Sequence, residues 1–421
     1  MTTHHDAAHA GLSPDSAFAY AQIALLPVKD VDACLAAALC GTDPDAAAIT
    51  LRSLTSAGLL EECPDEAGAG PRGRVFRFPS PELRRQAQET AHPHGQDQRL
   101  VLVLGWALAA TAAADALITP SHHHTLGLEP VAPDHPVRHT GPDGALAWLT
   151  AQGDNLIALV RAAHTAGHHT YVWRTVYSMW PWWRSDARHD WTDLHTLALD
   201  SLRQDSTGPA LAERHLLNAL GLAQRDSGAL DQAVETFYHV FQLAQTDVLG
   251  TAQAFHELGV THLKQLDLAQ AQRVLSLAQD LSTSEGYERG VALSDIALGE
   301  VALAEGRPEE ALSRFVTARN ALLDEPDPHD AARALAHKGR ALIQLGCVPD
   351  AEEALHEALL EVRAAQAPHL AARVLEWLGQ AAEASDRPAD ARTYYTQARE
   401  HYQPLNPADA ARVQDLLTRM T

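Results

Sequence analysis

Residues 216–398 carry a pattern of small and large apolar positions that returns five times. In each copy a glycine is followed after twelve residues by an alanine and, four residues later, by a large apolar side chain. The glycines are Gly221, Gly259, Gly299, Gly339 and Gly379, and the alanines are Ala233, Ala271, Ala311, Ala351 and Ala391. The large side chains are Phe237, Leu275, Phe315, Leu355 and Tyr395. Self-similarity at a spacing of 38 to 40 residues predicts a repeat protein whose copies stack.

Each copy is predicted to be two helices joined by a turn. Gly or Asp ends the first helix, and Pro308, Pro349 and Pro388 open the second, where the missing N–H costs nothing. We expect the small residues where two helices cross closely, so that Gly299 and Ala311 meet there. The large side chain, Phe315 in this copy, should fill the space beside the crossing and be buried.

The order Leu-Gly, Ala, Phe, Ala resembles the motif of the tetratricopeptide repeat (TPR). This resemblance implies a TPR superhelix over residues 206–421, with about five repeats and a capping helix over residues 408–421. The period exceeds the usual 34 residues or so, which implies helices lengthened by about one turn. Outside the repeats the chain is expected to be mainly α as well.

Residues 14–92 are predicted to form three helices and a β-hairpin, the order of a winged helix. The helices are expected over residues 14–26, 31–39 and 44–58, the last capped by Asp43 with Pro44 in its first turn. Residues 59–61 and 74–78 alternate like a strand pair around a flexible loop at 64–73. Residues 1–13 are expected to be a disordered tail.

Residues 93–205 are predicted to be a helical linker with degenerate repeats. It begins with a helix over residues 100–118, continues in a surface loop over 119–144, and ends in about four helices over 145–203. The apolar run Leu100–Ala114 is 15 residues long, which is short for a membrane span and favours a buried helix. Five of the eight tryptophans lie between Trp173 and Trp191, and we interpret them as packing that joins the linker to the repeats rather than as a ligand-stacking box.

The N-terminal module also resembles the winged helix of STAND-class (NB-ARC-type) regulatory ATPases, which include bacterial regulators of antibiotic production. The matching segments begin with Ala24-Leu-Leu-Pro, Ala36-Ala-Ala-Leu and Val75-Phe-Arg-Phe. Farther on they are Ala145-Leu-Ala-Trp-Leu, Asn155-Leu, Trp180-Pro-Trp-Trp and Asn218-Ala-Leu-Gly. In that family the module follows a nucleotide-binding domain and precedes TPRs, so the resemblance covers the C-terminal half of such a regulator.

The phosphate-binding motif of that family, G-x-x-x-x-G-K-[ST], is absent from this sequence. We therefore expect no ATPase activity and no bound ATP. Addition of Mg-ATP should leave the melting temperature unchanged, because a ligand that binds the native state tightly must raise it. A rise of several degrees would contradict this expectation.

The net charge of −22 makes nucleic acid a poor partner, because an acidic surface repels the phosphate backbone. Residues 1–92 hold seven Lys/Arg against twelve Asp/Glu, and Arg52 is the one cation of the third predicted helix. The four cysteines fit no disulfide framework or metal spacing, and the N-terminus has no apolar signal segment, which favours a reducing cytoplasm. No membrane association is expected.

No catalytic, cofactor or metal site is predicted. The sequence has no nucleophile elbow, Gly-rich nucleotide loop or H-E-x-x-H motif. The histidines His122, His123 and His124, with Glu129, Asp134, His135 and His139, lie in one predicted loop, where solvated side chains are the favoured interpretation and metal binding is left open.

The concave groove of the repeats is the best predicted functional surface. TPR geometry implies that the first helix of each repeat lines it, at fixed offsets from the repeat glycine. The residues at these offsets are His215, Asn218, Leu222, Arg225, Gln253, His256, Val260, Lys264, Leu293, Ile296, Glu300, Arg333, Arg340, Gln344, Glu376 and Gln380.

Asn218 stands in the Asn-x-Leu-Gly segment, and the resemblance to peptide-sensing TPR proteins implies that it clamps a ligand backbone. We therefore expect a non-catalytic cytoplasmic regulatory or adaptor protein that binds a peptide or partner protein in this groove. Two alternatives stay open: a transcriptional regulator acting through the winged helix, and an unrecognised biosynthetic enzyme on a TPR scaffold. A homo-oligomer is possible.

Overall fold

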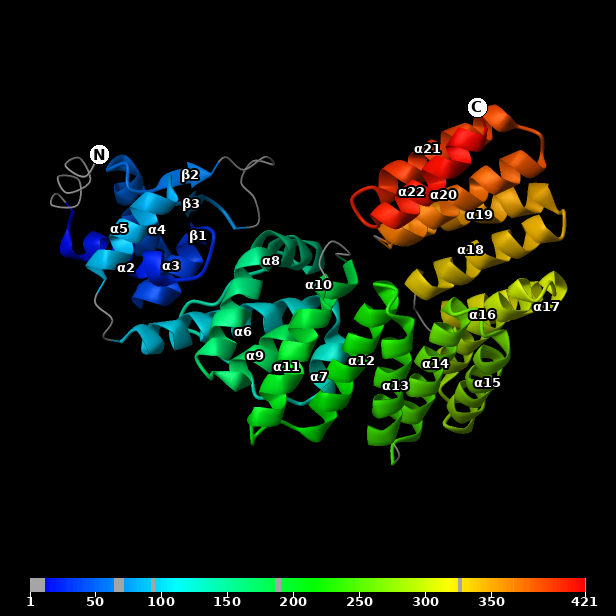
Figure 1. Cartoon of the computed structure of the whole chain (residues 1–421), viewed down its shortest axis with the longest axis horizontal. Coiled ribbons are helices and arrows are strands. Elements are labelled where there is room, and N and C mark those ends of the chain that lie inside the picture. The colour runs from blue at the N-terminus through cyan, green and yellow to red at the C-terminus, as the bar shows by residue number, and fades with distance from the viewer. Residues whose placement is uncertain are drawn as a thin grey trace. The chain divides into compact units, whose positions relative to one another are not determined.

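The computed structural model describes residues 12–63, 72–91, 95–185, 191–244, 246–324, 328–365 and 367–420. Nearly all of the predicted disordered tail and most of the predicted flexible loop at 64–73 lie outside these residues. The described chain is mainly α-helical, as predicted, with one small sheet (Figure 1). It divides into two compact units at Leu216 and Leu217, within the helix α12 (Ala210–Asp226).

The first unit begins with a small module of helices and strands. Its elements are α2 (Pro14–Leu25), β1 (Val31–Asp32), α3 (Ala33–Cys40), α4 (Pro44–Ser56), β2 (Glu61–Cys63), β3 (Val75–Arg77) and α5 (Pro81–Thr90). The helices after them are α6 (Gln96–Ile118), α7 (Pro120–Thr125), α8 (Pro142–Thr165), α9 (His169–Ser178), α10 (Trp180–Ser185) and α11 (Thr192–Gln204). The unit therefore spans both the predicted winged helix and most of the predicted linker.

Two local predictions for this unit are wrong. Val31 and Asp32 belong to β1 rather than to a helix, and β1 pairs with β3 in an antiparallel sheet of order β1-β3-β2. A strand of two residues is too short to leave an alternating pattern. The predicted loop at 119–144 contains α7, which opens with Pro120 and is fastened to α6 by Asp115: its carboxylate accepts a hydrogen bond from Thr119 and lies 2.9 Å from His122 Nδ1.

The helix α6 is long and apolar enough to cross a membrane by length and composition alone. It packs against α3, α8 and α9 instead, and Val103, Trp106, Ala107 and Ala114 on it are buried. The apolar run at 100–114 is thus accounted for by the core of the first unit, as predicted.

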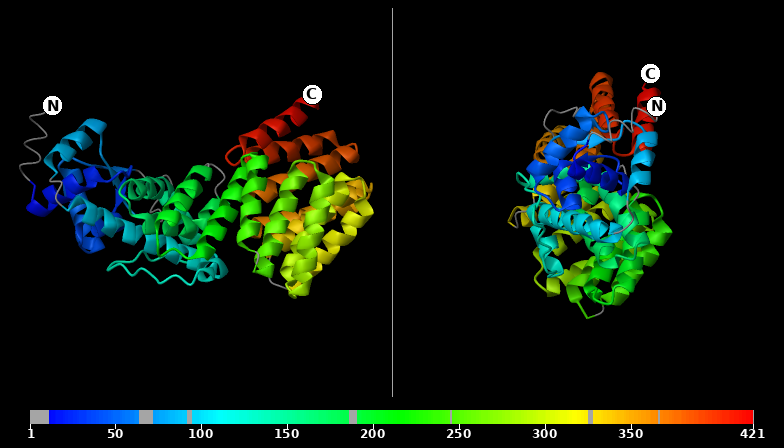
Figure 2. Two further views of the ribbon diagram at one scale, coloured as in Figure 1. Left: turned by 60° about the horizontal axis from the view of Figure 1, so that its bottom comes forward. Right: turned by 90° about the vertical axis from the view of Figure 1, so that its left-hand side faces the viewer.

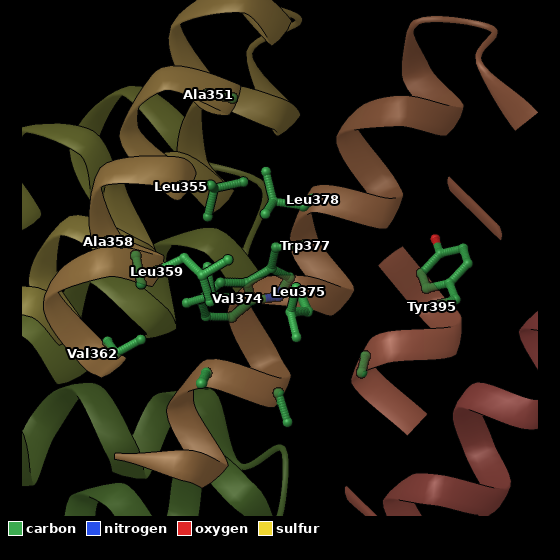
Figure 3. Close-up of a cluster of buried hydrophobic side chains, with 14 of the residues drawn as sticks. Ala351, Leu355, Ala358, Leu359, Val362, Val374, Leu375, Trp377, Leu378 and Tyr395 are labelled. Atoms are coloured by element: carbon green, nitrogen blue, oxygen red, sulfur yellow. The ribbon is translucent and has the colours of Figure 1, made fainter. Parts of the chain in front are cut away.

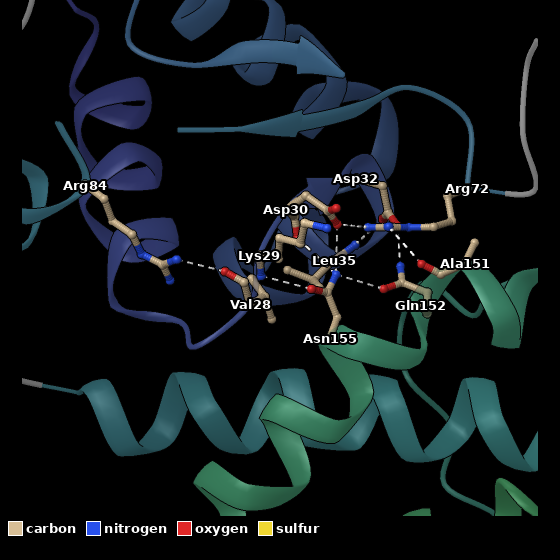
Figure 4. A network of polar contacts seen from close by, with 10 residues as sticks. All are labelled: Val28, Lys29, Asp30, Asp32, Leu35, Arg72, Arg84, Ala151, Gln152 and Asn155. Atoms are coloured by element: carbon tan, nitrogen blue, oxygen red, sulfur yellow. Dashed lines mark hydrogen bonds and ion pairs between the residues drawn. The ribbon is translucent and has the colours of Figure 1, made fainter. Parts of the chain in front are cut away.

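A buried polar network joins β1 to α8 (Figure 4). Arg72 donates to Asp30 at 2.7 Å, to Asp32 at 3.2 Å and to the carbonyl of Ala151 at 3.1 Å. Asp32 also accepts from Gln152 at 2.6 Å and caps α3 through the Leu35 N–H. Burial raises the pKa of the Asp32 carboxyl, although the Arg72 charge opposes the rise. Arg72, predicted to lie in the flexible loop, is therefore a fixed part of the core.

The second unit consists of helix pairs followed by a single helix (Figures 1 and 2). From α12 onward the pairs continue as α13 (Leu230–Leu243), α14 (Val248–Lys264), α15 (Leu268–Ser284), α16 (Glu288–Ala304), α17 (Pro308–Asp324), α18 (Pro328–Gln344), α19 (Val348–Ala364), α20 (Pro368–Ala384) and α21 (Pro388–Tyr402), and α22 (Pro407–Arg419) closes the chain. The helices from α14 to α20 have 17 residues each. The repeat is therefore longer than usual because its helices are longer, as expected. This is a superhelix of TPR-like repeats.

Each repeat glycine makes room for the large side chain of its own repeat. A Cβ on Gly299 would lie 2.5 Å from a ring carbon of Phe315, which is fully buried as predicted. The other four glycines face Phe237, Leu275, Leu355 and Tyr395 in the same way. In the fourth repeat a Cβ on Gly339 would also lie 3.4 Å from the carbonyl oxygen of Ala351, the residue equivalent to Ala311.

Neighbouring repeats share one apolar core, which Figure 3 shows for the fourth and fifth repeats. Leu355 and Leu359 of α19 pack with Val374, Leu375 and other buried residues of α20. Because each pair leaves apolar surface for the next pair to cover, a repeat cannot stand alone.

Gly299→Ala is expected to lower the melting temperature. Overpacking against Phe315 costs about 1–3 kcal/mol, which exceeds the roughly 1 kcal/mol that alanine gains over glycine inside a helix. Gly105→Ala in α6 is the matched control, because a Cβ there meets no atom within 4 Å. It should leave the melting temperature unchanged or raise it, and equal effects of the two substitutions would contradict the packing described here.

Candidate ligand-binding face of the repeats

The first helices of the repeats, α12, α14, α16, α18 and α20, carry the residues that were predicted to line a groove. From α14 onward each of these helices contacts the next first helix as well as its own partner. Burial lowers the pKa of His369 at the start of α20, and the charge of Asp226 at the end of α12 opposes this. First helices four repeats apart thus approach each other on this side, which we call the first-helix face.

The predicted residues differ widely in exposure. Asn218 and Glu376 are buried, and Lys264 and Gln344 are exposed. The half-buried residues are His215, Arg225, His256, Glu300, Arg333, Arg340 and Gln380. His215 lies in the first unit, where its ring meets the rings of His122 and Tyr177 edge-on.

Four of the predicted residues form ion pairs with Arg, Lys, Asp or Glu within the second unit, and a fifth, Glu300, lies 3.5 Å from His337 Nε2. Arg225 donates to Glu257 at 2.6 Å, and Lys264 pairs with Asp226 at 3.2 Å at an exposed position. Arg333 pairs with Asp330 at 3.2 Å, and Asp330 is also held by Arg289 at 2.7 Å. The Glu376 carboxylate accepts hydrogen bonds from both terminal guanidinium nitrogens of Arg412, at 2.6 and 2.8 Å, and so anchors the final helix α22.

Arg340 and Arg373 stand apart from these pairs. Neither guanidinium has a hydrogen bond or an ion pair with any residue that the structure describes. Arg340 lies over the ring of Trp377, 5.8 Å from its centroid. Arg373 is exposed. The N–H groups of these two arginines are therefore available to hydrogen-bond to another molecule.

Arg333, Arg340 and Arg373 gather around Glu300. Burial alone would raise the pKa of the Glu300 carboxyl, but these arginines and His337 outweigh it and hold the pKa below its usual range. His337 is fully buried between the rings of Phe315 and Trp377, and burial lowers its pKa to about 4. His337 is therefore neutral near pH 7, and the arginines supply the positive charge there.

Several buried polar atoms on the first-helix face have no hydrogen-bond partner among the described residues. They are Asn218 Oδ1, Arg225 Nε, His256 Nδ1, Arg333 Nε and His337 Nδ1. Buried polar groups are normally paired, and leaving one unpaired costs about 1–3 kcal/mol. These atoms belong to the first helices α12, α14 and α18.

Sequence reasoning missed Arg373, although a signal for it was present. Arg373 lies six residues before Gly379, and Arg333 lies six residues before Gly339. The same offset rule therefore selects both. His337 and Trp377 also share an offset, two residues before the repeat glycine, but apolar surroundings at this position gave no reason to single them out.

The histidine-rich and tryptophan-rich segments that the sequence analysis considered lie mainly in the first unit. His122 stacks on Tyr177 with ring centroids 4.2 Å apart and approaches the buried Asp115. Trp173 and Trp183 are buried, and Trp173 donates to Asp205 at 2.8 Å. These side chains pack the interior of the unit.

No protein-family model and no curated protein matches the chain. Solved structures with a similar fold include the apo form of RapI, at 13% identity and a TM-score of 0.49, covering 62% of this chain and 96% of that one. NprR in complex with its cognate peptide NprX matches at 13% identity and a TM-score of 0.46, over 59% of this chain and 72% of that one. A STAND protein with a TPR sensor from Pyrococcus horikoshii matches at 12% identity and a TM-score of 0.41, over 97% of this chain and 61% of that one. At these identities the likeness concerns the fold alone.

Proposed function

We propose that the protein is a non-catalytic regulatory or adaptor protein that binds an acidic peptide, or an acidic segment of a partner protein, on its first-helix face. The observation that supports this most is that Arg340 and Arg373 form no hydrogen bond or ion pair at contact distance with any described residue, although both act on the charge of Glu300. Charge-assisted hydrogen bonds from guanidinium to carboxylate are among the strongest in proteins. A carboxylate of the ligand would satisfy both side chains.

The other unpaired atoms suit a peptide backbone. Asn218 Oδ1 can accept a hydrogen bond from a backbone N–H, and Arg225 Nε and Arg333 Nε can donate to carbonyl oxygens. A peptide offers one donor and one acceptor at most residues, so it can meet donors and acceptors placed along successive first helices. Of the predicted groove residues, Asn218, Arg225, His256, Glu300, Arg333 and Arg340 stay in this proposal, and Arg373 joins them.

We further propose that α2 to β3 form a winged helix that serves as a structural or docking module, as in STAND-type regulators without their ATPase domain. The order helix, strand, helix, helix and hairpin supports the assignment. The third helix, α4, carries Arg52 as its one basic residue against Asp45, whereas DNA readout requires several Arg or Lys contacts. A mobility-shift assay at two salt concentrations should show no DNA complex.

Selection from a random peptide library displayed on phage tests the proposed function. We expect enrichment of peptides rich in Asp and Glu, with weaker capture at high salt because screening reduces the attraction. Selection against the Arg340→Ala/Arg373→Ala variant should lose this enrichment. Enrichment of apolar or basic peptides, or identical enrichment by the variant, would contradict the proposal.

A further inference from the structure

A cavity of about 470 Å³ lies in the first unit, where the N-terminal module meets α6 and α8. Its volume falls within the range of small-molecule sites. Leu25, Leu26, Leu39 and Leu100 form much of its wall, and Ala162 adds a small apolar surface from α8. The ends of α2, α3 and α8 and the start of α6 therefore line one pocket that is partly open to solvent.

The position of this cavity is fixed by polar contacts beside it. Arg84 of α5 donates to the carbonyls of Ala24, Leu26 and Val28, which closes the end of α2. Asn155 of α8 accepts from the Lys29 N–H at 3.0 Å and donates to Asp30. These bonds hold the segment after α2 against α8, so the cavity is preformed rather than a gap between loose parts.

Two polar side chains in the cavity wall lack partners. Gln22 is 5% exposed, and its amide makes no hydrogen bond within the described ranges. Arg99 has no ion pair with any described residue, and its buried Nε has no hydrogen-bond partner. Its guanidinium lies over the ring of Phe18, 4.3 Å from the centroid.

The acidic groups nearby leave Arg99 available. Asp97, at the rim, pairs with His168 at 2.7 Å. Asp15 and Arg99 both act on the Cys40 thiol, whose pKa burial raises to about 11, but they form no ion pair with each other. A half-buried guanidinium without a counter-ion is costly, and an anion in the cavity would remove that cost.

We propose that this cavity binds a small aliphatic carboxylic acid in its ionised form. The carboxylate accepts hydrogen bonds from the Arg99 guanidinium and the Gln22 amide, and the hydrocarbon chain lies against the leucines of the wall. The choice of an anion follows from Arg99, and the choice of an apolar body follows from the remaining lining. This site is independent of the first-helix face of the repeats.

Titration of the full chain with octanoate by calorimetry tests the proposal. We expect saturable binding of one octanoate per chain, and none of acetate, which has no hydrocarbon body, or of octylammonium, which carries the opposite charge. Arg99→Met should weaken octanoate binding at least about tenfold, because a hydrogen bond to a charged group contributes enough free energy for that factor. Arg161→Met, an exposed arginine on α8, is the matched control and should bind as the wild type does.

Ala166→Trp supplies a second test that leaves the buried wall intact. Ala166 lines the cavity but is itself exposed, so an indole there should block entry with little change in the melting curve. Absence of octanoate binding to the wild type, or unchanged binding by folded Arg99→Met or Ala166→Trp, would overturn the proposal. If Arg99→Met fails to fold, the result with Ala166→Trp decides.

Discussion

Arg72→Met is expected to destabilise the first unit by about 3–5 kcal/mol, because it leaves a buried carboxylate without its partner. The Arg72 side chain is 7% exposed and that of Asp32 is 3% exposed, so water cannot replace the lost bonds. Methionine keeps most of the length of the side chain, which limits the loss of packing. Chemical denaturation followed by circular dichroism measures the change in the free energy of unfolding.

Arg74→Met is the matched control for this experiment. Arg74 lies two residues farther along and pairs with Glu62 at 3.5 Å, but its side chain is 65% exposed. Exposed pairs contribute at most about 1 kcal/mol, so this substitution should change stability little. Equal effects of the two substitutions would mean that the network around Asp32 does not hold β1 to α8.

Arg340→Ala and Arg373→Ala are each expected to weaken binding of a selected acidic peptide by about thirtyfold or more. Loss of one partner of a desolvated charge pair costs about 2–5 kcal/mol, which corresponds to that factor. Neither guanidinium forms a hydrogen bond or ion pair within the described chain, so both variants should fold, with a loss of melting temperature that is small beside the loss of affinity because only the weaker interactions with Glu300 and Trp377 are removed. Isothermal titration calorimetry gives the affinities.

The control for this series is Arg363→Ala. Arg363 lies on α19, a second helix, and is exposed. It has the same charge as Arg340 but lies outside the first-helix face, so it should leave the affinity unchanged. A loss of affinity common to all three variants would indicate a general effect of net charge rather than a site.

The repeats could be predicted from the sequence because the residues that form the same helix–helix contact occur in every copy. A glycine that faces a large side chain sixteen residues later, as Gly299 faces Phe315, occurs in all five repeats. The position of this pair within each repeat predicts where the two helices and the turn between them lie. The same spacing placed the large side chain, Phe315, beside the glycine of its own repeat, where it is buried. The cap at Asp43, with Pro44 after it, placed α4 in the same local way.

Contacts between distant residues could not be predicted in this way. Arg72 stands in a Pro/Gly-rich stretch, and its partner Asp32 lies 40 residues earlier. Glu376 fits the offset rule for the groove, but Arg412, 36 residues later, binds it. No periodic signal links such pairs, because each occurs once in the chain. Such pairs decide which side chains of the first helices are already occupied, so that part of the site could not be predicted from the sequence.

A crystal structure of the protein with a selected acidic peptide tests the central claim most directly. We predict that the peptide lies along the first helices α12, α14, α16, α18 and α20. One of its carboxylates should lie within hydrogen-bonding distance of Arg340 and Arg373, and a backbone N–H should donate to Asn218 Oδ1. A peptide bound on the second helices or on the first unit, with Arg340 and Arg373 still unpaired, would contradict the account.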